Sequence, residues 1–137
     1  MTVPLFTSSV LFGSILVGFI AFYWTRLMRN WKTALLTIIV LLGILTSLLN
    51  HGTDLAAARW IDRAFMVVSG ITFLVILLEG VARRTYLLAL MGSAVLFYAV
   101  AKIVRKGAWS DGFHIACHGA ATAFIIGTLS SIPAITQ

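Results

Sequence analysis

The sequence predicts an all-α integral membrane protein, a single domain over residues 1–137 built as a bundle of five transmembrane helices. Of its 137 residues 61% are hydrophobic and only 10% are charged, and the mean hydropathy is +1.04. A soluble domain is nearer about 45–50% apolar and about 25% charged. The charged residues also gather in short clusters between long uncharged runs, which is typical of a multi-pass membrane protein.

Each uncharged run is long enough to cross a bilayer. A spanning helix needs about 20 apolar residues, because the hydrocarbon core is about 30 Å thick and a helix rises about 1.5 Å per residue. A helix also satisfies its own backbone hydrogen bonds in lipid, and no strand-like alternation competes with this interpretation. The predicted spans are residues 5–25, 33–50, 62–82, 85–104 and 110–130.

The charged residues set the limits of the predicted spans in order. The first span ends before Arg26, which is the first charge in the chain, and the second lies between Lys32 and Asp54. The third is uncharged from residue 64 to 78, the fourth is uncharged through residue 101, and the fifth ends shortly before Pro133. Tryptophans, which favour the headgroup level, stand at four of these limits: Trp24, Trp31, Trp60 and Trp109.

The opening of the chain and its net charge bear on targeting and partners. The first six residues lack the positive region of a signal peptide, so we expect the first span to belong to the mature fold. Ten Lys and Arg against four Asp and Glu give a net charge of +6. In a soluble protein this excess would suggest nucleic acid, but its distribution around apolar runs predicts no nucleic-acid partner. The basic residues divide equally between the two sides, so the sequence does not predict an orientation.

Ionisable residues inside the spans are costly and therefore point to function. His51 lies at the exit of the second span and Asp62 at the entry of the third, on one side of the membrane. Two further crossings return the chain to that side, where His114 and His118 begin the fifth span. Three histidines and one carboxylate are therefore expected at one depth in one leaflet. Glu79 lies at the other end of the third span, where we expect an ion pair with Arg83.

The spacing of these residues favours a metal site. His114 and His118 are four residues apart, so both imidazoles can point at one ion from one helix face. With His51 they form a three-nitrogen set that leaves a fourth tetrahedral position for water, as in a catalytic zinc site. Asp62 could accept the proton of that water, whose pKa bound zinc lowers to about 7. Ser47, four residues before His51, could donate a hydrogen bond nearby.

Each residue also has a purely structural interpretation. The histidine pair and His51 could be polar residues at the headgroup level, and Asp62 could begin a helix beside Arg63. Ser47 could pack against a neighbouring helix or bond to its own backbone. Cys117 is expected to pack rather than to bind metal. Only the expected convergence at one depth favours function.

The order Ser47-x3-His51, then Asp62, then His114-x3-His118 resembles the signature of the alkaline ceramidase and adiponectin-receptor (CREST) superfamily of membrane hydrolases. The resemblance implies Zn²⁺ held by the three histidines, a zinc-bound water activated by Asp62, and Ser47 close to the reacting carbonyl. It implies a lipid amide such as a ceramide as the usual substrate. We therefore expect a zinc-dependent hydrolase of a membrane lipid amide or ester.

The chain departs from that family in two respects. The family has seven spans and this sequence has room for five, so the lipid cavity is either open or completed by a second copy of the chain. Alkaline ceramidases also carry an acidic N-terminal segment that binds calcium. Here no acidic residue precedes Asp54, so we expect no calcium site.

Two other functions fit a short, basic, histidine-containing membrane chain. One is a haem- or quinone-binding anchor subunit, in which His51 and one histidine of the pair would face each other across the cofactor. The other is a non-catalytic helper protein or a conduit for protons or metal. The lack of an ionisable chain reaching the other leaflet weighs against a conduit.

Overall fold

The computed structural model describes residues 3–79, 84–104 and 107–132. Five helices account for nearly all of them: α1 (Val3–Met28), α2 (Trp31–Gly52), α3 (Ala56–Leu78), α4 (Arg84–Val104) and α5 (Ala108–Ser131). All five are long and apolar enough to cross a membrane, and the described residues contain no strand. The predicted all-α architecture of five helices, each long and apolar enough to cross a membrane, is confirmed for the described residues.

The start of α3 differs from the predicted start at Asp62. The helix begins at Ala56, because the alanines at residues 56–58 favour helix. The helix can start before the membrane-spanning segment does, since the polar residues of its first turns need not enter the lipid. At its other end α3 stops at Leu78, and Glu79 forms the cap. Residues 80–82 of the predicted span lie outside the described residues, as does Arg83, the expected partner of Glu79.

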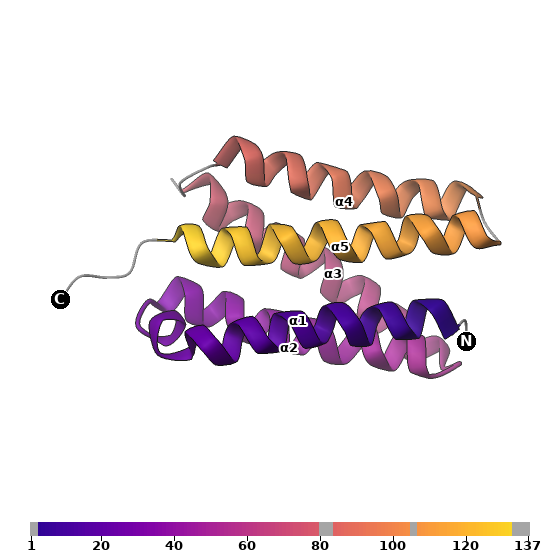
Figure 1. The fold of residues 1–137 in the computed structure, drawn as a ribbon, viewed down its shortest axis with the longest axis horizontal. Helices are drawn as coiled ribbons and strands as arrows, with labels where there is room; N and C mark the ends of the chain where they lie inside the picture. Colours follow the sequence, from indigo (N-terminus) through magenta and orange to yellow (C-terminus); the bar gives the residue numbers. More distant parts are fainter. Residues whose placement is uncertain (1–2, 80–83, 105–106, 133–137) are drawn as a thin grey trace.

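The helices pack in the order α4, α5, α1, α2, α3. Figure 1 shows α4 beside α5 and α1 beside α2, with α3 crossing behind them at an angle. Although α3 and α4 follow each other in the chain, they do not form one of the closely packed pairs. The contacts therefore run from α4 through α5, α1 and α2 to α3, whereas α3 and α4 make little contact with each other.

Small residues allow two of the close pairs to form. A Cβ atom added at Gly127 of α5 would lie 2.6 Å from Leu87 Cδ2 of α4, and one at Gly13 of α1 would lie 3.0 Å from Ile44 Cγ2 of α2. Close approach of this kind is how helices gain packing energy in lipid, where no hydrophobic force drives them together. Apolar side chains cover the outside, as Phe22 does with 81% of its surface exposed.

Polar contacts tie the helix ends together at the end of the bundle remote from the histidines. Lys32 at the start of α2 forms an ion pair with Glu79 at the end of α3. Arg26 of α1 donates from Nη2 to the carbonyl of Ser130 in α5, at 3.0 Å. The pairing of Glu79 with Lys32 places this carboxylate away from the histidine end, as the topology predicts.

Candidate metal centre

Three histidines from two helices meet inside the bundle. His51 comes from the last turn of α2, and His114 and His118 come from the first half of α5. Each histidine offers one ring nitrogen, and these three nitrogens all lie within 4.8 Å of one another. The ring centroids are 5.1, 5.6 and 5.0 Å apart, and the rings are inclined by 65–90° rather than stacked. Rings inclined in this way can direct their nitrogen lone pairs toward a common point.

The separation of the nitrogens fits a tetrahedral metal. Two nitrogens bound to one zinc at about 2.0–2.1 Å and separated by the tetrahedral angle lie about 3.4 Å apart. The observed limit of 4.8 Å exceeds that value by a distance that rotation of half-buried imidazoles can close. The donor set is therefore suited to a borderline ion such as Zn²⁺, which favours imidazole nitrogen.

Ser8 of α1 holds one of these rings through its second nitrogen. The Ser8 hydroxyl donates to the carbonyl of Leu5 at 2.9 Å and lies 3.0 Å from Nδ1 of His118. A hydroxyl has one proton, so when Leu5 receives it the His118 Nδ1–H donates to the Ser8 oxygen. His118 then keeps the lone pair on Nε2, and metal-binding histidines are commonly fixed in this way through the nitrogen that does not bind.

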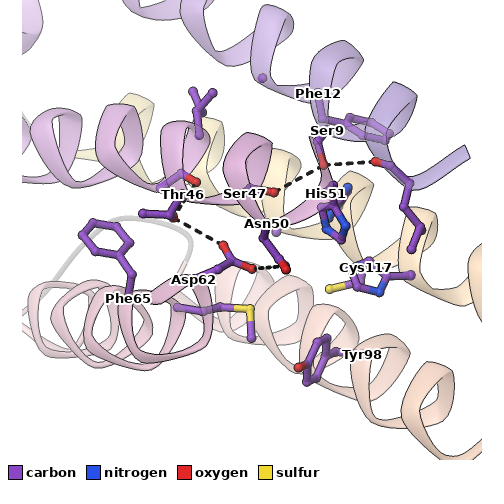
Figure 2. A pocket seen from close by; sticks show the side chains of 18 of the residues that line it. Ser9, Phe12, Thr46, Ser47, Asn50, His51, Asp62, Phe65, Tyr98 and Cys117 are labelled. Atoms are coloured by element: carbon purple, nitrogen blue, oxygen red, sulfur yellow. Dashed lines mark hydrogen bonds between the residues drawn. The ribbon is translucent and has the colours of Figure 1, made fainter. Parts of the chain in front are cut away.

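Asp62 lies in the same region, held by two side chains of α2 (Figure 2). Asn50 donates from Nδ2 to one carboxylate oxygen at 2.7 Å. Thr46 shares the proton of Oγ1 between the other carboxylate oxygen, at 3.3 Å, and the carbonyl of Gly43, at 3.1 Å. Thr46 and Asn50 are one turn apart and face α3 together. Asp62 is within electrostatic range of His51 but does not belong to the close group of nitrogens. Its geometry suits a base beside the centre rather than a ligand.

Ser47 and His51 form the neighbouring row of α2, again one turn apart. Ser47 Oγ lies 3.3 Å from Ser9 Oγ of α1, as Figure 2 shows. Ser9 in turn donates to the carbonyl of Leu5 at 3.1 Å, which leaves Ser47 as the donor between the two serines. Ser47 therefore has no hydrogen bond to a histidine, and its hydroxyl is held at the wall of the cavity.

All five residues predicted from the sequence line one cavity of about 720 Å³. Side chains from all five helices surround it, including Tyr98 of α4, whose ring lies 5.9 Å from that of His114 at 70°. Cys117 also lines the cavity but is not part of the close histidine group. The cavity thus joins the histidines, the carboxylate and the Ser47 hydroxyl in one space.

Sequence reasoning assigns no role to four residues that hold the site: Ser8, Ser9 and Thr46, which it does not single out, and Asn50, which it notes only as a polar neighbour of Ser47. Hydroxyls in membrane helices commonly bond to their own backbone, and Thr7, Ser8 and Ser9 all do so here. Nothing in the residue types separates the two that also reach another helix. The spacing of Thr46 and Asn50, one turn apart and one residue before Ser47 and His51, is the only available signal.

Comparison with known proteins adds no relative to this description. No protein-family model matches the chain, and neither a curated protein nor a solved structure does. The resemblance to the CREST superfamily therefore rests on the five residue positions themselves.

Proposed function

We propose that the chain is a zinc-dependent intramembrane hydrolase that cleaves the acyl bond of a lipid amide or ester. One observation carries the proposal: the three imidazoles of His51, His114 and His118 gather in the same cavity as the hydrogen-bonded carboxylate of Asp62. Burying four such groups in a membrane bundle is costly, and a catalytic centre is a reason to keep them together.

Each residue of the site would have a different role in the reaction, according to its position. The three histidines would hold Zn²⁺, which when bound polarises a carbonyl and lowers the pKa of water. Asp62 would take a proton from the attacking water, because its oxygens accept hydrogen bonds from Thr46 and Asn50 and are kept oriented toward the cavity side of α2. Ser47 would turn its hydroxyl from Ser9 to the reacting carbonyl oxygen.

The rest of the cavity supports a lipid substrate. Away from the histidines its wall is apolar, with Leu16, Val40 and Phe73 from three helices. Because α3 and α4 make little contact with each other, we expect an acyl chain to enter from the surrounding lipid between these two helices. An open five-helix cavity is thus compatible with hydrolysis without a second copy of the chain.

The geometry favours a metal over the alternatives. Imidazoles packed edge to face at 5.0–5.6 Å leave no room for the macrocycle that would have to lie between two axial ligands. A conduit would need polar groups along its length, whereas the far half of the cavity is lined by apolar residues such as Ile39 and Ile125. Both observations support a single polar site at one depth.

The test combines metal content with product formation in purified protein. We expect one zinc per chain, a loss of zinc in His114→Ala, and retained zinc without fatty-acid release in Asp62→Asn. Asp111→Asn is the matched control, because Asp111 lines the same cavity from the first turn of α5. Fatty-acid release that is unchanged in both His114→Ala and Asp62→Asn would refute the proposal.

A further inference from the structure

Three cationic side chains line the end of the cavity that holds the histidines. Arg59 and Arg63 lie one turn apart near the start of α3, and Lys102 lies near the end of α4. Lys102 is within electrostatic range of both Arg63 and the carboxylate of Asp62. Arg63 on α3 and Lys102 on α4 therefore line the cavity from two helices that do not pack closely against each other.

None of these cations has a carboxylate partner among the described residues. The contacts of Arg63 and Lys102 are with aromatic rings, Arg63 over Trp60 at 5.4 Å and Lys102 over Tyr98 at 5.1 Å. Such contacts fix the position of a cation without neutralising it. Two like charges held near each other, neither of them in an ion pair with a carboxylate of the described residues, form a site where an anion is stabilised.

The net charge of the cavity with a metal ion bound also favours an anionic ligand. Among the described residues, its lining carries three cationic side chains and three carboxylates, the latter being Asp54, Asp62 and Asp111. These charges cancel, so a divalent ion on neutral histidines leaves an excess of two positive charges. An anionic group can therefore enter without meeting a net negative charge.

The apolar part of the cavity determines the chemistry of the rest of the ligand. On α3 the lining extends from Arg59 to Phe73, which at about 1.5 Å per residue is about 20 Å along the helix. This is roughly two thirds of the hydrocarbon core. A long acyl chain can lie along this wall while the polar end of the molecule remains beside the histidines and the cations.

We propose that the substrate is an anionic amphiphile, an acyl chain joined through an amide or ester to a small group that bears a carboxylate or phosphate. The anion lies between Arg63 and Lys102, and the acyl bond reaches the histidines. This inference rests on the hydrolase function proposed above. Water adds to the acyl carbon, the C–N or C–O bond breaks, and a proton passes to the leaving nitrogen or oxygen. The products are a fatty acid and a small anionic amine or alcohol.

The experiment compares two pairs of compounds that differ in charge. The amide pair is N-oleoylglycine and the neutral N-oleoylethanolamine, and the ester pair is oleoyl lysophosphatidic acid and the neutral monooleoylglycerol. The native protein should favour the anionic member of the hydrolysed pair by about tenfold or more in kcat/KM, the effect of one charge-assisted contact. The two pairs also distinguish a carboxylate from a phosphate.

The variants are Arg63→Gln, Lys102→Gln and both together. We expect the double variant to keep its zinc and to lose the preference, because KM rises for the anionic compound and not for its neutral counterpart, while any effect on kcat through Asp62 is shared by both compounds and cancels in their ratio. Arg63→Lys with Lys102→Arg should keep the preference. Arg29→Gln is the control, because Arg29 precedes α2 at the opposite end of the bundle and does not line the cavity.

The outcomes separate this inference from the proposed function. Equal rates for both members of a hydrolysed pair, or faster neutral hydrolysis, would overturn the anionic substrate and leave the hydrolase in place. A preference that survives in the double variant would overturn the assignment of Arg63 and Lys102. Failure of the zinc-loaded protein to hydrolyse either anionic compound would overturn the anionic substrate, whereas the hydrolase itself is decided by the test with His114→Ala and Asp62→Asn.

Discussion

Ser8 Oγ lies 3.0 Å from Nδ1 of His118, a contact that joins the first turns of α1 to α5 across 110 positions of the chain. Because Ser8 already donates to Leu5, it acts as an acceptor for the imidazole N–H. The contact orients the His118 ring and leaves Nε2 for a metal. Ser8 is thus a positioning residue rather than a ligand.

Replacing Ser8 should therefore weaken metal binding without removing a ligand. We expect Ser8→Ala to lower zinc affinity by about 10- to 100-fold, the usual cost of losing such a partner. Competition with a chromophoric chelator measures the affinity, and the visible spectrum of the Co²⁺-loaded protein reports the ligand geometry. Thr7→Ala is the control, because Thr7 bonds only to the carbonyl of Val3. Equal affinities in the two variants would contradict the role assigned to Ser8.

Replacing Asn50 should affect catalysis and not metal content. Asn50→Ala removes the 2.7 Å hydrogen bond that orients the Asp62 carboxylate. A hydrogen bond to a charged group contributes about 1.5–3 kcal/mol, so we expect kcat to fall by about 10- to 100-fold. Thr53→Ala is a suitable control, since the Thr53 hydroxyl donates to the carbonyl of Leu49 only. A loss of zinc in Asn50→Ala would instead make Asn50 part of the metal site.

The close contact of α4 and α5 makes a prediction about stability. Gly127→Ile places a branched side chain where even a Cβ atom meets Leu87, and we expect a cost of about 1–3 kcal/mol in the free energy of unfolding. Gly18→Ile is the matched control, because no atom lies within 4 Å of a Cβ there. Unfolding in mixed detergent micelles measures both variants, and similar losses would show that α4 and α5 are less tightly packed than described.

The ion pair of Lys32 with Glu79 should contribute little to stability. The two side chains are 30% and 48% exposed, and exposed pairs contribute about 0–1 kcal/mol. We expect Glu79→Gln to leave zinc content unchanged and to lower the free energy of unfolding only slightly. The Lys32→Glu/Glu79→Lys double variant should recover that loss. A large change in zinc content would show that the two ends of the bundle are coupled.

Much of the fold follows from where charges interrupt the apolar runs. Arg26, Lys32 and Asp54 mark limits that α1 and α2 respect closely, because charged groups are costly in lipid. The same reasoning failed at α3, since a charge such as Asp62 can lie inside a helix when another helix supplies hydrogen bonds. The number of crossings places His51 and the α5 pair on one side, and this parity predicts their meeting.

The packing order and the supporting residues could not be predicted in the same way. The short connection between α3 and α4 indicates that their ends are near, yet the two helices diverge and α5 packs against α1 and α4 instead. Ser8 and Ser9 look like any hydroxyls bonded to their own helix. Their contacts with His118 and Ser47 depend on how α1 turns toward its neighbours, which is a property of the assembled bundle.

His51 stands one residue before the end of α2, and this helix makes only slight direct contact with α5. An ion shared by His51, His114 and His118 would therefore act as a crosslink between two helices that are otherwise weakly connected. Ligand binding to the native state stabilises it by RT ln(1 + [L]/Kd), so the apparent melting temperature rises with the ligand concentration and the affinity. Removing the ion with a chelator should thus lower the melting temperature as well as any activity. We expect unfolding to begin with fraying of the last turn of α2.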